Sequence, residues 1–177
     1  IHAPMALNLP KLPAPVMQVM KDTLFGQRLK YSWTPKGVDP SLHRAGKSKG
    51  TLIGGNLSIL YSLSGTSSDI ETTGKILFIE DLDEYLYHID RMMMNLKRSG
   101  KLAGLSGLIV GGMTEMKDNT IPYGKTAEAI IREAVQEYDY PVVFGFPGGH
   151  VTNNYPLIFG REVTLNVAEK MELSFHP

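Results

Sequence analysis

Apolar and polar positions alternate along the chain in a way that predicts strands and helices in turn from residue 50 onward. Four short apolar runs have the composition of buried strands: residues 51–53, 75–79, 108–110 and 141–146. Apolar residues at helical spacing predict helices between these runs, over residues 57–63, 85–96 and 126–138. This order predicts an α/β domain whose central strands are parallel.

Both ends of the chain are predicted to contain further elements. Residues 157–159, 163–167 and 170–175 read as short antiparallel strands joined by tight turns, so the sheet is expected to be mixed, with an antiparallel C-terminal edge and flanking helices. Near the start, a helix is predicted over residues 14–25, opened by prolines and closed by Gly26.

Basic and acidic residues are unevenly distributed, although their totals are equal. Residues 1–50 hold eight Lys or Arg and two Asp or Glu, which leaves ten basic and sixteen acidic residues in 51–177. Most of the basic excess lies in a Pro- and Gly-dotted stretch that predicts a solvated linker, with a binding role for its lysines as the alternative. The balanced total predicts neither a nucleic-acid partner nor an anionic membrane.

The chain contains no cysteine. A disulfide scaffold, a thiolate metal site and a cysteine nucleophile are therefore excluded, and a reducing compartment is compatible. The histidines other than His150 have no metal-ligand spacing with each other or with acids, so we expect no metal and no cofactor. No apolar stretch approaches the roughly 18 residues of a membrane span.

Two ionisable residues follow predicted strands. Glu80 comes directly after the run 75–79, and His150 closes a Gly-rich turn after the run 141–146. Ligands bind at the carboxyl ends of parallel strands, and a carboxylate that accepts the Nδ1–H of a histidine prepares it for general-base work. The alternatives stay open: the acidic run 80–84 also suits the N-terminus of a helix, and His150 also suits an ordinary loop histidine.

A second glycine-rich segment offers a weaker candidate. The backbone N–H groups of Gly55 and Asn56, just before a predicted helix, could bind an anionic part of a substrate, although a tight turn is the favoured interpretation. The segment lacks the lysine of a phosphate loop and the third glycine of a dinucleotide fingerprint. No serine stands in a G-x-S-x-G elbow, so the Glu–His pair lacks a nucleophile.

Several motifs together resemble one family. They occur in the order and spacing of the LD-carboxypeptidases, the murein tetrapeptide carboxypeptidases and microcin-resistance peptidases: HAPM (2–5), GGNL (54–57), GKILFIED (74–81), LSGLIVGGM (105–113), IPYGKT (121–126) and PVVFGFPGGH (141–150). The resemblance implies a Ser-Glu-His triad in which Glu80 and His150 are the acid and the histidine. It places the serine in an N-terminal domain, upstream of Ile1.

The same resemblance implies a domain division and an activity. Residues 1–30 would be the tail of the N-terminal nucleophile domain, 31–49 a linker, and 50–177 the C-terminal domain that carries Glu80 and His150. The implied enzyme is a cytoplasmic bacterial serine carboxypeptidase that hydrolyses an L,D-peptide bond and releases D-alanine from murein tetrapeptides during cell-wall recycling. It would use no cofactor and form a homodimer, and this chain alone is expected to be inactive.

Two other functions stay open at this point. A microcin-immunity-type peptidase would cleave an aminoacyl-nucleotide amide with the same triad. A non-catalytic muropeptide-binding fragment would keep the pocket without turnover. A serine in the segment expected upstream would indicate an enzyme, and its replacement would indicate a binding module. Assays with both substrates would distinguish the two peptidases.

Overall fold

Seven strands form one mixed sheet in the computed structural model, which describes residues 1–176. Their order is β1-β7-β6-β2-β3-β4-β5; neighbours from β2 to β5 are parallel, and neighbours from β2 back to β1 are antiparallel. This confirms the predicted mixed α/β sheet. The strands are β1 (Lys30–Trp33), β2 (Gly46–Asn56), β3 (Ile76–Leu82), β4 (Gly107–Thr114), β5 (Val142–Val143), β6 (Glu162–Val167) and β7 (Met171–Phe175).

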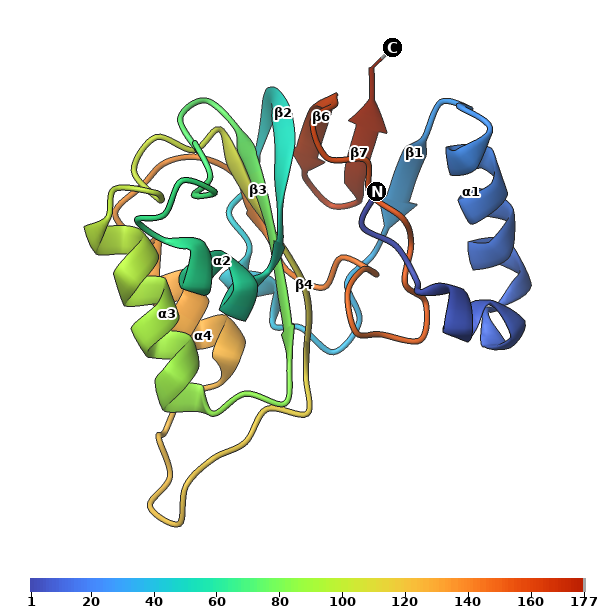
Figure 1. Cartoon of the computed structure of the whole chain (residues 1–177). Coiled ribbons are helices and arrows are strands. Elements are labelled where there is room, and N and C mark those ends of the chain that lie inside the picture. Colours follow the sequence, from blue (N-terminus) through green and yellow to red (C-terminus); the bar gives the residue numbers. More distant parts are fainter. Residues whose placement is uncertain (177) are drawn as a thin grey trace.

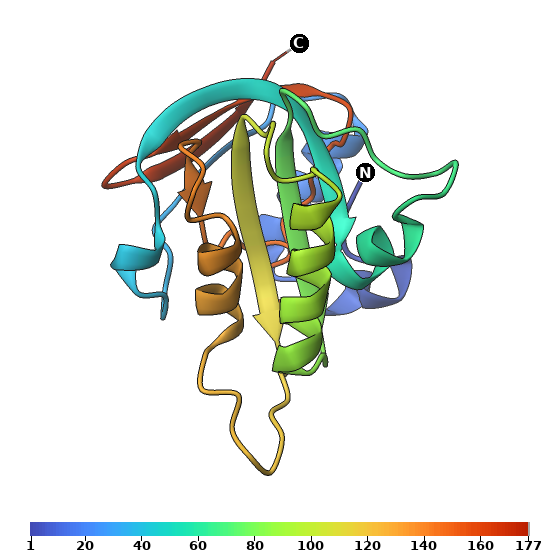
Figure 2. The ribbon, with the colours of Figure 1, turned by 90° about the vertical axis from the view of Figure 1, so that its left-hand side faces the viewer.

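Helices cover one face of the parallel half of the sheet. Figures 1 and 2 show α2 (Leu57–Leu63), α3 (Leu86–Arg98) and α4 (Ala127–Ala134) on this face. On the other side of the molecule, α1 (Ala14–Leu24) lies next to β1 (Figure 1). Two short 3₁₀ helices, η1 (Ala6–Lys11) and η2 (Pro40–Leu42), complete the elements. None of the helices in residues 1–176 combines the length and apolarity needed to cross a bilayer.

The central strand β3 is buried on both faces. Leu77 and Ile79 pack with the buried side chains of α2, α3 and α4, whereas Ile76 and Phe78 pack with β1, β6 and β7. All four side chains are fully buried. A continuous apolar run is the pattern expected of such a strand, and it explains why this segment was recognisable from sequence.

Two glycine-containing segments lie inside strands. β4 continues through Gly111, and β2 continues through Gly54 and Gly55, which pair with Phe78 and Ile79 of β3. A Cβ at Gly111 would lie 2.6 Å from the carbonyl oxygen of Gly148, so glycine is required here for close backbone approach. The expected tight turn at residues 54–56 was therefore wrong.

Several element boundaries also differ from expectation. The stretch 31–49 contains most of β1, all of η2 and the start of β2, although the division into domains stays a prediction. In the run 141–146 only two residues form a strand, because Gly145 turns the backbone with a φ of 71°. Residues 157–159 form no strand, and Leu157 makes a single bridge to His2.

Candidate active site

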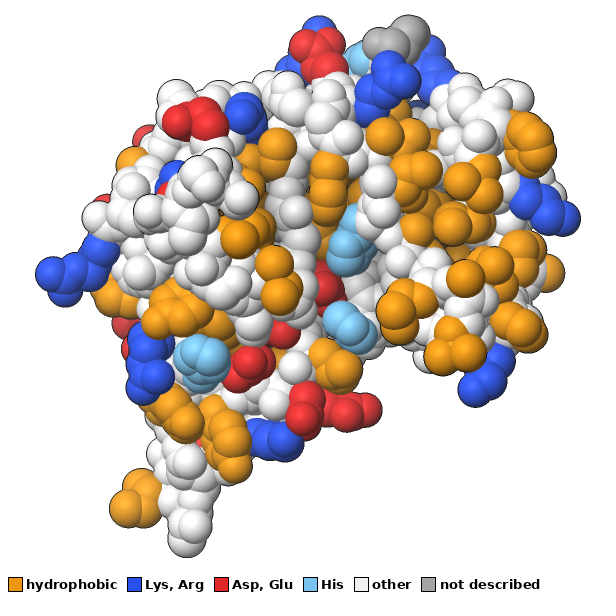
Figure 3. All heavy atoms as spheres, viewed as in Figure 1, with side chains coloured by type: hydrophobic (Ala, Val, Ile, Leu, Met, Phe, Trp, Pro, Cys, Tyr) orange, Lys and Arg blue, Asp and Glu red, His pale blue; other side chains and the backbone are white. Residues whose placement is uncertain are grey.

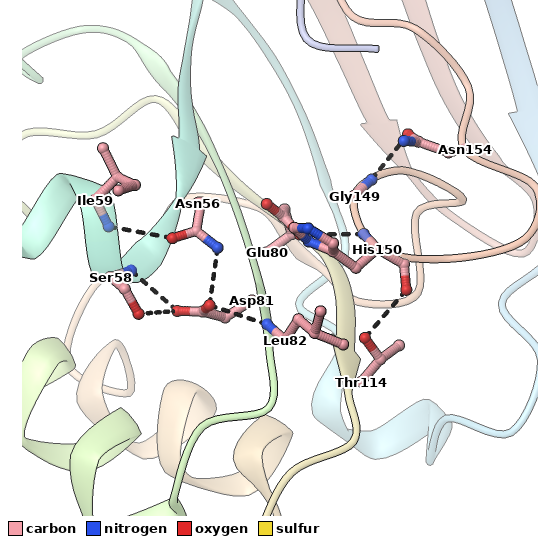
Figure 4. A network of polar contacts seen from close by, with 10 residues as sticks. All are labelled: Asn56, Ser58, Ile59, Glu80, Asp81, Leu82, Thr114, Gly149, His150 and Asn154. Carbon is pink, nitrogen blue, oxygen red and sulfur yellow. Dashed lines mark hydrogen bonds and ion pairs between the residues drawn. The ribbon is translucent and has the colours of Figure 1, made fainter. Parts of the chain in front are cut away.

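Glu80 and His150, seventy positions apart in the chain, are in contact at the carboxyl ends of the parallel strands. The Nδ1 atom of His150 lies 2.8 Å from Oε2 of Glu80, and the backbone N–H of His150 donates to the same oxygen at 3.1 Å (Figure 4). The structure thus brings together the two residues that the sequence placed at strand ends. Glu80 lies within β3 itself, opposite Asn56 of β2, rather than after the strand.

The two side chains differ sharply in exposure. The Glu80 side chain is 1% exposed, whereas that of His150 is 49% exposed. An ionised carboxylate can only accept hydrogen bonds, so it holds the proton of the imidazole on Nδ1 and leaves Nε2 as the nitrogen with a free lone pair. The pair can therefore take a proton from a group that approaches His150 from solvent.

Backbone contacts fix the loop that carries His150. The N–H of Gly112 in β4 donates to the carbonyl of Gly148 at 3.0 Å, and the Thr114 hydroxyl donates to the carbonyl of His150 at 3.0 Å. The N–H of Gly149 donates to the side-chain oxygen of Asn154 at 3.0 Å (Figure 4). The loop is thus held both to the neighbouring strand and to its own continuation.

The acid–imidazole pair lies in the wall of a pocket of about 620 Å³. The lining comes from the N-terminal segment, the ends of β2 and β3, and the loop after Pro147: His2–Met5, Asn8, Lys11, Leu12, Asn56, Glu80, Leu82, Gly149–Thr152 and Asn154. Figure 3 shows histidine and acidic side chains together at this hollow between the two halves of the molecule. A second hollow, of about 480 Å³, lies over the outer face of α3 and includes neither Glu80 nor His150.

The structure distinguishes between Gly55 and Asn56, the two weaker candidates for substrate binding. Asn56 lines the pocket, while Gly55 is not among the lining residues. The Asn56 side chain accepts from the N–H of Ile59 at 3.1 Å, which caps α2, and donates to Asp81 at 2.8 Å. One amide hydrogen of Asn56 is therefore left for a ligand.

Asp81 is a residue whose role sequence reasoning missed. Its buried carboxylate accepts from Asn56, from the backbone N–H of Leu82, and from both the N–H and the hydroxyl of Ser58 (Figure 4). The acidic run was expected to stabilise the helix that follows it, but Asp81 instead stabilises the N-terminus of α2, a helix that precedes it in sequence. Only the fold brings these segments together.

His2 is a second such residue. It lines the pocket, and its ring lies 5.2 Å from that of Phe78 and 5.7 Å from that of Phe159, measured between centroids. Burial lowers the pKa of His2 below its ordinary value, and the charge of Glu80 partly opposes this effect. The only sequence signal was its place in the HAPM motif.

The fold and the pocket together indicate what the site can do chemically. A buried carboxylate that holds a half-exposed histidine, at the carboxyl ends of parallel strands, is an arrangement capable of general acid–base chemistry. Within residues 1–176, no cluster of three or more His, Asp or Glu side chains is placed to hold a metal ion. The family model of the LD-carboxypeptidase C-terminal domain matches residues 49–165, and the chain belongs to this family.

Relatives with names from the same family align with most of the chain. A protein of Bacillus subtilis named as a probable murein peptide carboxypeptidase is 38% identical over 129 residues, which is 71% of this chain and 39% of the relative. The murein tetrapeptide carboxypeptidase of Pseudomonas aeruginosa is 27% identical over 172 residues, 93% of this chain and 55% of the relative. The chain thus spans about two fifths to just over half the length of these relatives.

Solved structures share the fold. The muramoyltetrapeptide carboxypeptidase of Oxalobacter formigenes superposes with a TM-score of 0.82 at 28% identity, over 94% of this chain and 56% of that one. The microcin C7 self-immunity protein MccF, solved in complex with glutamyl sulfamoyl guanosine, gives a TM-score of 0.77 at 20% identity, over 99% of this chain and 60% of that one. The second likeness concerns the fold alone.

Proposed function

We propose that this chain supplies the acid and the histidine of a bacterial serine LD-carboxypeptidase. The enzyme would hydrolyse the bond between the L-configured centre of a diamino acid and a terminal D-alanine in murein tetrapeptides, during cell-wall recycling in the cytoplasm. The observation that carries the proposal is the contact between Glu80 and His150 in the wall of a pocket. Family membership and the names of the relatives support it.

The mechanism assigns one role to each residue. A serine hydroxyl attacks the carbonyl of the scissile bond while Nε2 of His150 accepts its proton. The same nitrogen then gives the proton to the amine of the departing D-alanine, and a water molecule hydrolyses the acyl-enzyme by the reverse sequence. Glu80 holds the imidazole through Nδ1 and stabilises the imidazolium that forms.

The nucleophile is proposed to lie in the part of the family that this chain does not span. No serine of the described residues lines the pocket. Ser58, the serine beside Asp81, contacts two carboxylates at 2.7 and 3.0 Å rather than the imidazole of His150, and it does not line the pocket. We therefore expect this chain alone to release no D-alanine and to need the serine-bearing segment.

The remaining amide hydrogen of Asn56 suits the carboxylate end of the substrate. Asn56 faces the same pocket as His150, and Asp81 fixes the orientation of its amide. A fixed N–H donor beside the reacting bond can orient a ligand without loss of side-chain entropy at the moment of binding. Gly55 plays no direct part in this arrangement.

Substitution of His150 tests the proposal. In the full-length protein, His150→Ala is expected to lower kcat for D-alanine release from murein tetrapeptide by about 10³-fold or more. The matched control is His88→Ala, because His88 also pairs with a glutamate (Nδ1 to Glu84 Oε2, 2.7 Å) but lies outside the pocket. Turnover close to that of the native enzyme in His150→Ala would refute the proposal.

One second candidate has a specific observation in its favour. The fold matches that of the microcin self-immunity protein over nearly the whole chain, and that protein was solved with aminoacyl sulfamoyl nucleosides. Cleavage of an aminoacyl-nucleotide amide would use the same acid and histidine. Parallel assays with both substrates decide between the two, and binding of a muropeptide without turnover of either would instead indicate a non-catalytic module. The proposed homodimer is checked by light scattering.

A further inference from the structure

The loop between β5 and β6 that carries His150 is closed at its base. The N–H of Tyr155 donates to the carbonyl of Pro147 at 2.8 Å, and the Tyr31 hydroxyl of β1 donates to the carbonyl of Pro156 at 2.5 Å. The His150 side chain is 49% exposed, so few atoms pack around the imidazole. Its position therefore depends mainly on the backbone of this loop and on the contact with Glu80.

The backbone next to His150 is held by two consecutive N–H groups. Gly149 has a φ of +95°, and glycine, which lacks a Cβ, can leave this conformation as easily as it adopts it. The N–H of Gly149 donates to Oδ1 of Asn154 at 3.0 Å, and the N–H of His150 donates to Glu80 at 3.1 Å (Figure 4). Without Asn154, the first of these donors would lose its acceptor and the backbone at Gly149 would be less restrained.

The contact with Gly149 also fixes which way the amide of Asn154 is turned. A backbone N–H can only donate, so the oxygen of the amide faces Gly149 and the NH₂ group points away from it. Among residues 1–176 this nitrogen makes no hydrogen bond, and it is not one of the buried polar atoms that lack a partner. Asn154 lines the same pocket as His150, so its two amide hydrogens are accessible to a ligand there.

We propose that Asn154 is a positioning residue for His150 and, through its NH₂ group, a donor to the bound peptide. Its oxygen holds the N–H of Gly149 and thereby keeps Nδ1 of His150 on Glu80. Its nitrogen donates to a backbone carbonyl oxygen of the peptide, since a neutral amide is a donor suited to a neutral acceptor in a pocket. One side chain would thus connect substrate binding to the placement of the general base.

The proposal deepens the proposed function, on which its catalytic meaning rests, but its first test needs no turnover. ¹H–¹⁵N spectra of this chain are expected to show the neutral ring of His150 with its proton on Nδ1. In Asn154→Ala the Gly149 amide should exchange with solvent at least about tenfold faster, and part of the His150 population should carry its proton on Nε2 instead. Asn154→Asp keeps an acceptor for Gly149 and should restore both native signals.

Asn153→Ala is the matched control, because Asn153 precedes Asn154 in the same loop and does not line the pocket. It should leave the exchange of Gly149 and the proton of His150 unchanged. The positioning role is overturned if Asn154→Ala gives the same spectra as Asn153→Ala, or if Asn154→Asp fails to restore what Asn154→Ala loses. These results do not depend on whether the full-length protein releases D-alanine.

Kinetics of the full-length enzyme separate the two roles of Asn154. Asn154→Ala loses both the acceptor and the donor, so it should lower kcat about tenfold and raise KM for murein tetrapeptide about tenfold. Asn154→Asp keeps the acceptor but has no NH₂ group, so kcat should recover most of its native value while KM stays high. Native kcat in a folded Asn154→Ala enzyme would contradict the positioning role, and a native KM in Asn154→Asp would contradict the donor role.

Discussion

Gly149 allows the loop that carries His150 to approach Glu80. Its φ is +95°, and a Cβ at this position would lie 2.6 Å from Cγ of Glu80. Both the backbone conformation and the space therefore require glycine. At the scale of single residues, the contact between Glu80 and His150 therefore also requires that position 149 carry no side chain.

Gly149→Ala is expected to destabilise the chain by about 2–4 kcal/mol, since it combines left-handed backbone strain with a clash against a buried carboxylate. Gly160→Ala is the matched control, because Gly160 has a φ of +84° and no atom within 4 Å of the position that an added Cβ would occupy. It should cost only about 1 kcal/mol. Urea unfolding measures both free energies, and equal losses would show that the clash has no effect.

At the scale of secondary-structure elements, Asp81 connects three of them. It joins the end of β3 to the N-terminus of α2 and orients Asn56 at the end of β2. The neighbouring acid Asp83 contrasts with it, because Asp83 is about half exposed and forms an ion pair with Lys117, which is exposed to a similar extent. These two acids of one short run are therefore expected to contribute very differently to the stability of the fold.

Asp81→Asn should lower the free energy of unfolding by about 1–3 kcal/mol, because it weakens several hydrogen bonds to a buried carboxylate. Asp83→Asn should change it by less than about 1 kcal/mol, as expected of an exposed ion pair. Urea unfolding again provides the measurement. The role assigned to Asp81 would be wrong if the two variants were equally stable.

The elements that sequence predicted well are those with a periodic apolar pattern. The expected limits of the helix over 57–63 match α2, and those of the helix over 14–25 match α1 to within a residue. The glycine-rich segment 54–56 was misread as a tight turn, because only the fold shows that Gly54 lies where another backbone approaches closely. The glutamate and histidine of the site were recognisable from their places after apolar runs, whereas Asp81 and His2 act through contacts between distant segments.

Two partly buried histidines make the stability of the whole molecule sensitive to acid. Burial lowers the pKa of both His2 and His43. Nδ1 of His43 also accepts from the N–H of Phe144 at 3.2 Å, a bond that protonation would break. The unfolded chain therefore binds protons at a higher pH than the folded chain does at these positions.

The sign of the effect follows from linkage. Stability from these histidines is fully present above the unfolded pKa near 6.5 and is lost as the pH falls below it. The free energy of unfolding should thus decrease from pH 7.5 to pH 5.5, and the decrease should be smaller in the His2→Gln, His43→Gln double variant. Urea titrations at the two pH values test this, and a double variant with the native pH dependence would contradict it.

Cooperation between Glu80 and His150 in hydrolysis is the central claim, and a double-mutant cycle tests it most directly. The measurement is kcat for D-alanine release from murein tetrapeptide by the full-length enzyme and by its Glu80→Gln, His150→Ala and doubly substituted variants. Because Glu80 is proposed to act through the imidazole, the double variant should be no slower than His150→Ala alone. Losses that simply multiply, or a Glu80→Gln enzyme with native turnover, would show that the two residues do not work as a pair.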